Sequence, residues 1–104
     1  MMMQSDVFEL QAEICKVMAN PKRIRIIALL KDQEKSVTEI AESLGISQSN
    51  TSQHLMIMKA KGVVKTRRVG REIRYSIAVP ELSLACEFVG RALEKIVAGT
   101  RTAE

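Results

Sequence analysis

Hydrophobic residues recur along much of this chain at the spacing of amphipathic helices. Residues 5–18 carry apolar side chains three or four positions apart, which predicts a first helix. A second helix is expected from Pro21 to about Lys31, because proline suits the first helical position. The polar residues 31–35 that follow are expected to form a loop. A last helix is expected over 80–98, where apolar positions alternate in steps of four and three and form a seam typical of paired helices.

The middle of the chain carries the signals of two helices joined by a tight turn. Ser36 followed by Glu39 is a capping box, which predicts that a helix begins there. Gly45 stands where a helix ends in a left-handed residue, and Ser47 is placed to cap the next helix. Residues 36–62 therefore predict a helix-turn-helix.

A change of period follows this motif. Residues 63–77 alternate in polarity around Gly70, which predicts two strands joined by a tight hairpin tip. The expected fold is one mainly α domain over residues 1–104, with four helices, a small β-hairpin and a fifth helix. This order is that of a winged helix-turn-helix, with 63–77 as the wing.

Positive charge is concentrated on the predicted helix-turn-helix and the wing. The whole chain has a formal net charge of +4, but between Ser47 and Tyr75 there are seven basic residues and one acidic residue. The remainder has nine basic and eleven acidic residues. This asymmetry favours a polyanionic partner.

No apolar run reaches the length of a membrane span, and no signal peptide is visible, so a cytoplasmic protein without membrane contact is expected. Hydrophobic residues make up 46% of the chain but aromatic residues only 3%, which predicts an aliphatic core. A core this small favours dimerisation as a way to bury more apolar surface.

The second helix of the predicted helix-turn-helix, the reading helix, has an apolar side that is expected to comprise Thr51, Leu55, Met56 and Met58. It begins with short polar side chains that match the donors and acceptors on base edges. These are Gln48, Ser49, Asn50, Ser52, Gln53 and His54. A second set of candidates is cationic and suits phosphate contacts. It comprises Lys59, Lys65, Arg67, Arg68, Arg71 and Arg74. The alternatives are a solvated helix face and a hairpin charged for solubility.

Three segments resemble the ArsR/SmtB family of winged helix-turn-helix repressors: CKVMANPKRIRIIALL, SVTEIAESLGISQSNTSQHLMIMKAKGVV and VKTRRVGREIRYSI. The resemblance covers nearly the whole chain and is most specific in the middle segment. It implies a homodimer held by the helices at 5–18 and 80–98, bound to a pseudo-palindromic double-stranded DNA operator. It also implies release by an inducer, which in this family is often a metal ion.

The chain departs from both metal sites that the family resemblance implies. The segment 36–43 lacks the family's Cys-x-Cys pair, and the last helix has no histidine. Two scattered cysteines do not make a closed tetrahedral zinc site. We therefore expect neither a metal site nor a cofactor.

Cys15 and Cys86 lie on the two helices expected at the dimer interface, so they are candidates for a thiol sensor that changes how these helices pack. The alternative is that both are small buried hydrophobic side chains.

The sequence thus predicts a DNA-binding transcriptional regulator, most simply a repressor, and not an enzyme. The alternative is a winged-helix module that binds an acidic partner protein through its basic face. A dithiol oxidoreductase is disfavoured because the cysteines lack Cys-x-x-Cys spacing.

Overall fold

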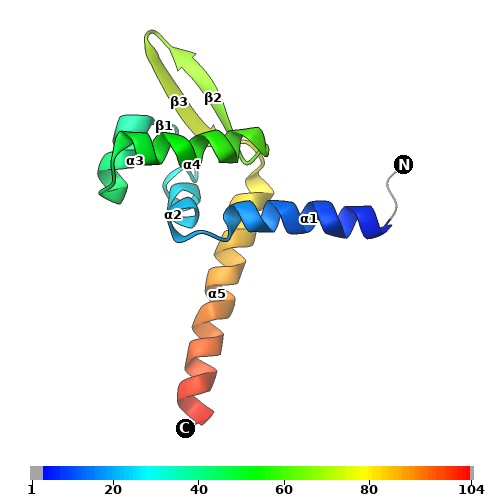
Figure 1. Cartoon of the computed structure of the whole chain (residues 1–104). Coiled ribbons are helices and arrows are strands. Elements are labelled where there is room, and N and C mark those ends of the chain that lie inside the picture. The colour runs from blue at the N-terminus through cyan, green and yellow to red at the C-terminus, as the bar shows by residue number, and fades with distance from the viewer. Residues whose placement is uncertain (1–3, 104) are drawn as a thin grey trace.

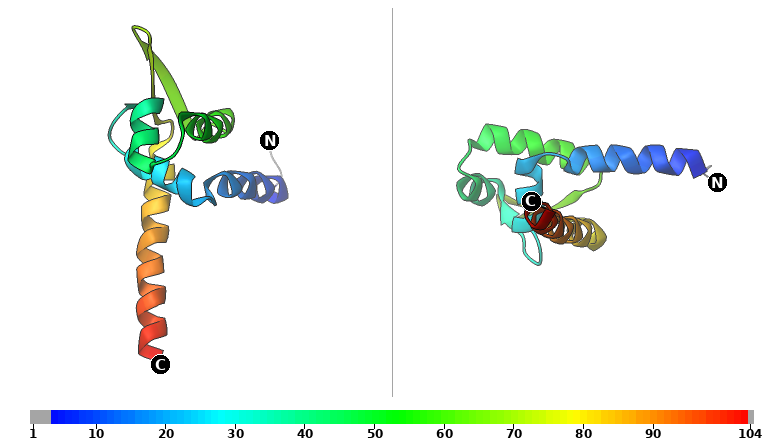
Figure 2. Two further views of the ribbon diagram at one scale, coloured as in Figure 1. Left: turned by 60° about the vertical axis from the view of Figure 1, so that its left-hand side comes forward. Right: turned by 90° about the horizontal axis from the view of Figure 1, so that it is seen from below.

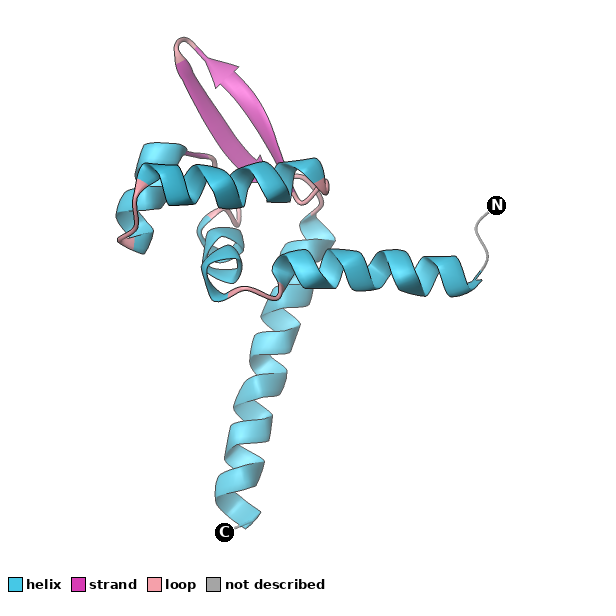
Figure 3. Cartoon of the chain, in the orientation of Figure 1, coloured by secondary structure: helices cyan, strands magenta, loops and turns pink. Residues whose placement is uncertain are grey.

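The computed structural model describes residues 4–103, and Figures 1 and 3 show the predicted mainly α fold with a small β-hairpin. The elements in chain order are α1 Gln4–Met18, α2 Pro21–Leu29, β1 Lys35–Ser36, α3 Val37–Leu44, α4 Gln48–Ala60, β2 Val64–Val69, β3 Glu72–Ile77 and α5 Pro80–Ala103. The winged helix-turn-helix order predicted from the sequence is confirmed.

The core lies where α2, α3 and α4 meet the base of the hairpin. It is aliphatic, as the composition predicts, and its fully buried members include Ile26, Ile27, Leu30, Ile40, Leu55, Met58 and Val63. Burying each such side chain contributes roughly 1.5–3 kcal/mol before the entropy of ordering the chain is subtracted. This small core holds the two helices of the helix-turn-helix in a fixed relation.

Local side-chain chemistry sets the ends of α3 and α4. The Ser36 hydroxyl accepts the backbone N–H of Glu39 at 3.2 Å, and the Glu39 carboxylate accepts the backbone N–H of Ser36 at 2.9 Å. Gly45 ends α3 with φ +68°, a left-handed conformation that glycine adopts without a steric cost. The Ser47 hydroxyl then accepts the N–H of Asn50 at 3.0 Å. All three signals confirm the turn predicted from the sequence.

The segment after α2 differs from its prediction as a polar loop. Lys35 and Ser36 form the short strand β1, which pairs antiparallel with β3 and gives the strand order β1-β3-β2. Two residues cannot display a period, and their partners lie about forty positions later, so no local pattern predicts this strand. β1 ties the start of α3 to the wing.

Two helix ends also differ from their predictions. α2 ends at Leu29 instead of Lys31, since Leu30 already has a non-helical cap conformation. α5 continues to Ala103, past the expected end at residue 98, with Gly99 inside the helix. α1 and α5 both project away from the core, and the hairpin extends on the side opposite the far end of α5 (Figures 1 and 2).

Candidate nucleic-acid interface

The reading helix α4 has one buried side and one polar side. Thr51, Leu55 and Met58, spaced four and three apart, are fully buried against the core. Gln48, Ser49, Ser52 and Gln53 are exposed, while Asn50 and His54 are half-buried. Four of the six candidate base-reading side chains are therefore exposed on the outer side of a helix whose inner side is buried in the core.

One assignment on this helix was wrong. Met56 was expected on the apolar side, but its side chain is 66% exposed. At about 100° per residue, position 56 is turned away from the face shared by Thr51, Leu55 and Met58. Thr51 lies on the buried side as expected. Its hydroxyl donates to the Ser47 carbonyl at 2.9 Å, so this buried polar group has a hydrogen-bond partner.

His54 differs from the other polar residues of α4 because α2 holds its ring. Arg23 Nε donates to His54 Nδ1 at 3.1 Å. Burial lowers the pKa of His54, and the charges of Arg23 and Lys22 lower it further. The imidazole is therefore neutral at pH 7.

The six candidate cations divide into two groups. Lys59, Lys65, Arg68 and Arg71 are exposed and form no ion pair with other residues of the described range. Arg67 instead makes two hydrogen bonds to the Glu34 carboxylate, at 2.6 and 3.0 Å. Only the first group offers its full charge to an incoming anion.

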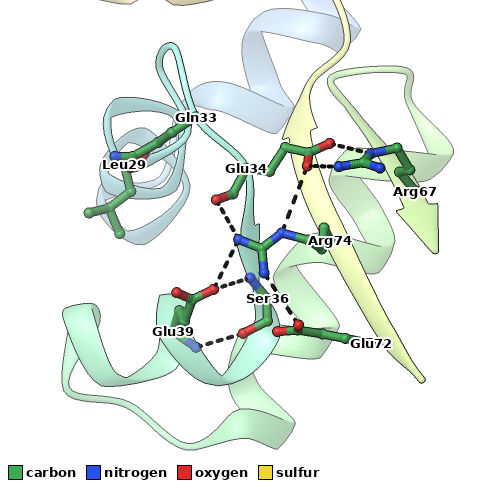
Figure 4. Close-up of polar contacts among 8 residues, drawn as sticks. All are labelled: Leu29, Gln33, Glu34, Ser36, Glu39, Arg67, Glu72 and Arg74. Carbon is green, nitrogen blue, oxygen red and sulfur yellow. Dashed lines mark hydrogen bonds and ion pairs between the residues drawn. The ribbon is translucent and has the colours of Figure 1, made fainter. Parts of the chain in front are cut away.

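Arg74 is the more enclosed of the paired arginines, with a side chain that is 25% exposed against 63% for Arg67. Figure 4 shows Arg74 between Glu34, Glu39 and Glu72. Three carboxylates surround it, those of Glu34, Glu39 and Glu72, at 3.7, 3.5 and 3.3 Å. It also donates to the Glu34 backbone carbonyl at 3.1 Å. Arg74 thereby connects β3 to β1 and to the start of α3.

These contacts lower the local charge below the value implied by counting residues along the chain. The hydrogen bond from Arg67 lowers the pKa of Glu34, and the backbone N–H of Ser36 lowers the pKa of Glu39. Both carboxylates are thus ionised at neutral pH beside the wing. The charge count over residues 47–75 did not include Glu34 and Glu39, because β1, which brings these carboxylates next to the wing, was not predicted.

Apolar side chains are exposed along both projecting helices. On α1 they are Val7, Phe8 and Leu10, and on α5 they are Leu84, Phe88, Val89, Leu93, Ile96 and Val97. Phe8 and Phe88 are 60% and 61% exposed. Exposed apolar side chains in this number are typical of a surface that associates with another protein.

The two cysteines occupy different environments. Cys15 is exposed on α1, whereas Cys86 is half-buried on α5, with its Sγ 4.0 Å from the Met18 Sδ. Burial raises the pKa of the Cys86 thiol. The interpretation that both are buried hydrophobic side chains is therefore wrong for Cys15 in the single chain.

Within residues 4–103, no three His, Cys, Asp or Glu side chains are grouped so that they could hold a metal ion. The metal sites implied by the family resemblance do not fit this chain. Nor is any described helix both long and apolar enough to span a bilayer.

The fold and the exposed polar helix define a winged helix-turn-helix protein, and comparison with known proteins gives the family. Residues 20–66 match the model described as "Bacterial regulatory protein, arsR family". The uncharacterized HTH-type transcriptional regulator Rv0081 of Mycobacterium tuberculosis is 37% identical over 92 residues, which span 88% of this chain and 81% of that protein. The chain belongs to the arsR family of bacterial regulatory proteins.

Solved structures agree with this assignment. The crystal structure of Rv0081 superposes with a TM-score of 0.82 at 35% identity, over 90% of this chain and 95% of the other. A homodimeric winged helix-turn-helix DNA-binding domain, Mb0332 from Mycobacterium bovis, has a TM-score of 0.82 at 26% identity, over 90% and 87%. The transcriptional repressor PagR of Bacillus anthracis has a TM-score of 0.72 at 38% identity, over 83% and 99%.

Proposed function

We propose that this chain is a homodimeric repressor that binds a pseudo-palindromic operator in double-stranded DNA. The observation that carries the proposal is the capped helix α4, whose outer side exposes Gln48, Ser49, Ser52 and Gln53 while its inner side is locked in the core. A helix held in this way presents amides and hydroxyls to base edges in the major groove. The family assignment supports the same function.

The unpaired cations extend the contact along the DNA backbone. Lys65, Arg68 and Arg71 lie on the wing, and Lys59 lies in the last turn of α4. Their charges act on phosphates and give affinity without choosing a sequence. Arg67 and Arg74 are proposed to act mainly through the carboxylates that they hold, since their charge is already compensated.

Two copies are proposed to pair through the apolar faces of α1 and α5. Each face would otherwise expose large aliphatic and aromatic side chains to water. The homodimeric state of Mb0332 supports the pairing of two copies. Reading helices in a dimer bind half-sites about 34–36 Å apart, one turn of DNA.

The experiment that tests this function is selection of duplexes from a random library, followed by footprinting of the selected site. We expect a palindromic motif and two protected major-groove segments one turn apart. A winged-helix module that binds an acidic partner protein would select no DNA motif, and that result would refute the proposal. A transcription assay on the selected site then distinguishes repression from activation.

Release from the operator is proposed to involve the thiols of Cys15 and Cys86. Any reaction would begin at Cys15, which is exposed, because burial raises the pKa of the Cys86 thiol and lowers its thiolate fraction. DNA shift assays on reduced, oxidised and polysulfide-treated protein test this step. The matched controls are Cys15→Ser and Cys86→Ser, and a wild-type affinity that no treatment changes refutes the thiol step.

A further inference from the structure

The side chain of Arg23 lies between three helices, at a point where the backbone of α1 lacks a partner. In a continuing helix the Val17 carbonyl would accept the N–H of residue 21, but residue 21 is proline and has no N–H. Arg23 Nη1 donates to this carbonyl instead, at 3.2 Å. The guanidinium therefore donates to the Val17 carbonyl the hydrogen bond that Pro21 cannot donate.

The same guanidinium reaches the reading helix through the 3.1 Å contact between Arg23 Nε and His54 Nδ1. An arginine N–H is always a donor, so the nitrogen that it contacts must carry a lone pair. The imidazole proton must then be on Nε2. The contact fixes which of the two neutral forms of the ring is present.

The other edge of the ring is accessible from outside. Every buried side-chain nitrogen and oxygen in the described residues has a hydrogen-bond partner. Nε2 of the half-buried His54 has none within residues 4–103, so it reaches the surface. It does so on α4, one residue after the exposed Gln53.

We propose that Arg23 is a positioning residue that holds His54 as a neutral N–H donor toward DNA, so that this position recognises a hydrogen-bond acceptor. The inference rests on the proposed function. The acceptor is either a phosphate oxygen or a base atom such as guanine O6 or N7. A protonated ring would face the guanidinium with a second N–H and lose the contact, and the low pKa of His54, due to burial, Arg23 and Lys22, prevents this at pH 7.

The first test is NMR of the imidazole nitrogens in the full chain. His54 is the only histidine, so its signals need no assignment. We expect a protonated Nε2, a bare Nδ1 and a titration midpoint below the ordinary 6.5. Arg23→Lys keeps the charge but loses the fork of donors, and should give a mixture of the two neutral forms. Arg25→Lys, at an exposed site on α2, is the matched control and should change nothing.

The second test measures affinity for a duplex selected by the wild type. His54→Asn places an amide oxygen at the position of Nδ1 and so keeps the bond from Arg23, but it lacks the outer donor. His54→Gln carries its amide nitrogen at the position of Nε2. A dimer loses this contact in both protomers, so we expect His54→Asn to weaken binding by about 3- to 10-fold per half-site, or about 10- to 100-fold for the dimer, and His54→Gln to weaken it less.

The outcomes separate this inference from the proposed function. An effect of His54→Asn that is equal on all sequences identifies a phosphate acceptor, and one confined to a single base pair identifies a base. A wild-type ring with its proton on Nδ1, or His54→Asn binding as tightly as the wild type, refutes the inference. Failure of the wild type to select any duplex refutes the proposed function, whatever the NMR shows.

Discussion

Replacing Arg68 and Arg71 together with alanine is expected to flatten the salt dependence of DNA binding. Both side chains are exposed on or beside the tip of the wing, and neither forms an ion pair with another described residue. They are therefore the wing arginines whose charge is available to phosphates. Removing them should weaken binding to all duplexes similarly, because phosphate contacts carry no sequence information.

The size of the effect follows from the number of charges removed. Two arginines in each protomer make four in a dimer, and each phosphate contact contributes about 0.9 to the slope of log affinity against log salt. If all four contact phosphate, the slope should fall by about 3 to 4. Arg67→Ala should change the slope less per residue, because Glu34 already compensates that guanidinium.

The assay is fluorescence anisotropy of a labelled duplex at a series of salt concentrations. Lys95→Ala is the matched control, since it removes a positive charge from α5, which extends away from the wing (Figure 1). An unchanged slope for the Arg68 and Arg71 variant, or an equal change in the control, would refute the reasoning.

Three further predictions concern stability and assembly. Leu55→Ala should lower the free energy of unfolding by about 2–5 kcal/mol in urea melts, because the side chain is fully buried; a loss under 1 kcal/mol would contradict the core assignment. Val89→Glu should convert dimers to monomers in sedimentation, whereas an unchanged mass would exclude the α5 face. Since the pKa values of Glu34 and Glu39 are lowered from 4.5, their stabilisation is present above pH 4.5 and is lost as pH falls through the folded values. Acid unfolding should therefore be less steep after Glu34→Gln and Glu39→Gln, and an unchanged steepness would contradict these hydrogen bonds and ion pairs.

The sequence was sufficient wherever a few neighbouring residues determine the backbone. The Ser36 and Glu39 capping box, the left-handed Gly45 and the Ser47 cap all depend on contacts within four positions. Each has one local solution, so α3, the turn and α4 could be placed from the chain alone. The outer and inner sides of α4 followed from the helical period, with Met56 as the exception.

The sequence was insufficient where distant residues meet. Arg67 and Arg74 were predicted to be phosphate ligands from their charge, and no local pattern indicates that Glu34 reaches both, because β1 pairs with β3 across about forty positions. Arg23 was not selected as a functional residue, since its partners belong to α1 and α4. A proline four residues after Val17 was the one local sign that a carbonyl there needs another donor.

The central claim is that the outer side of α4 reads base pairs, and Gln53→Ala tests it most directly. Affinities would be measured for the selected operator and for every single base-pair substitution of it, with the variant and the wild type. The account predicts that Gln53→Ala loses discrimination at one symmetric pair of positions, by about 1–3 kcal/mol each, while Lys59→Ala weakens all sequences equally. Uniform weakening by Gln53→Ala, with discrimination intact at every position, would contradict the claim.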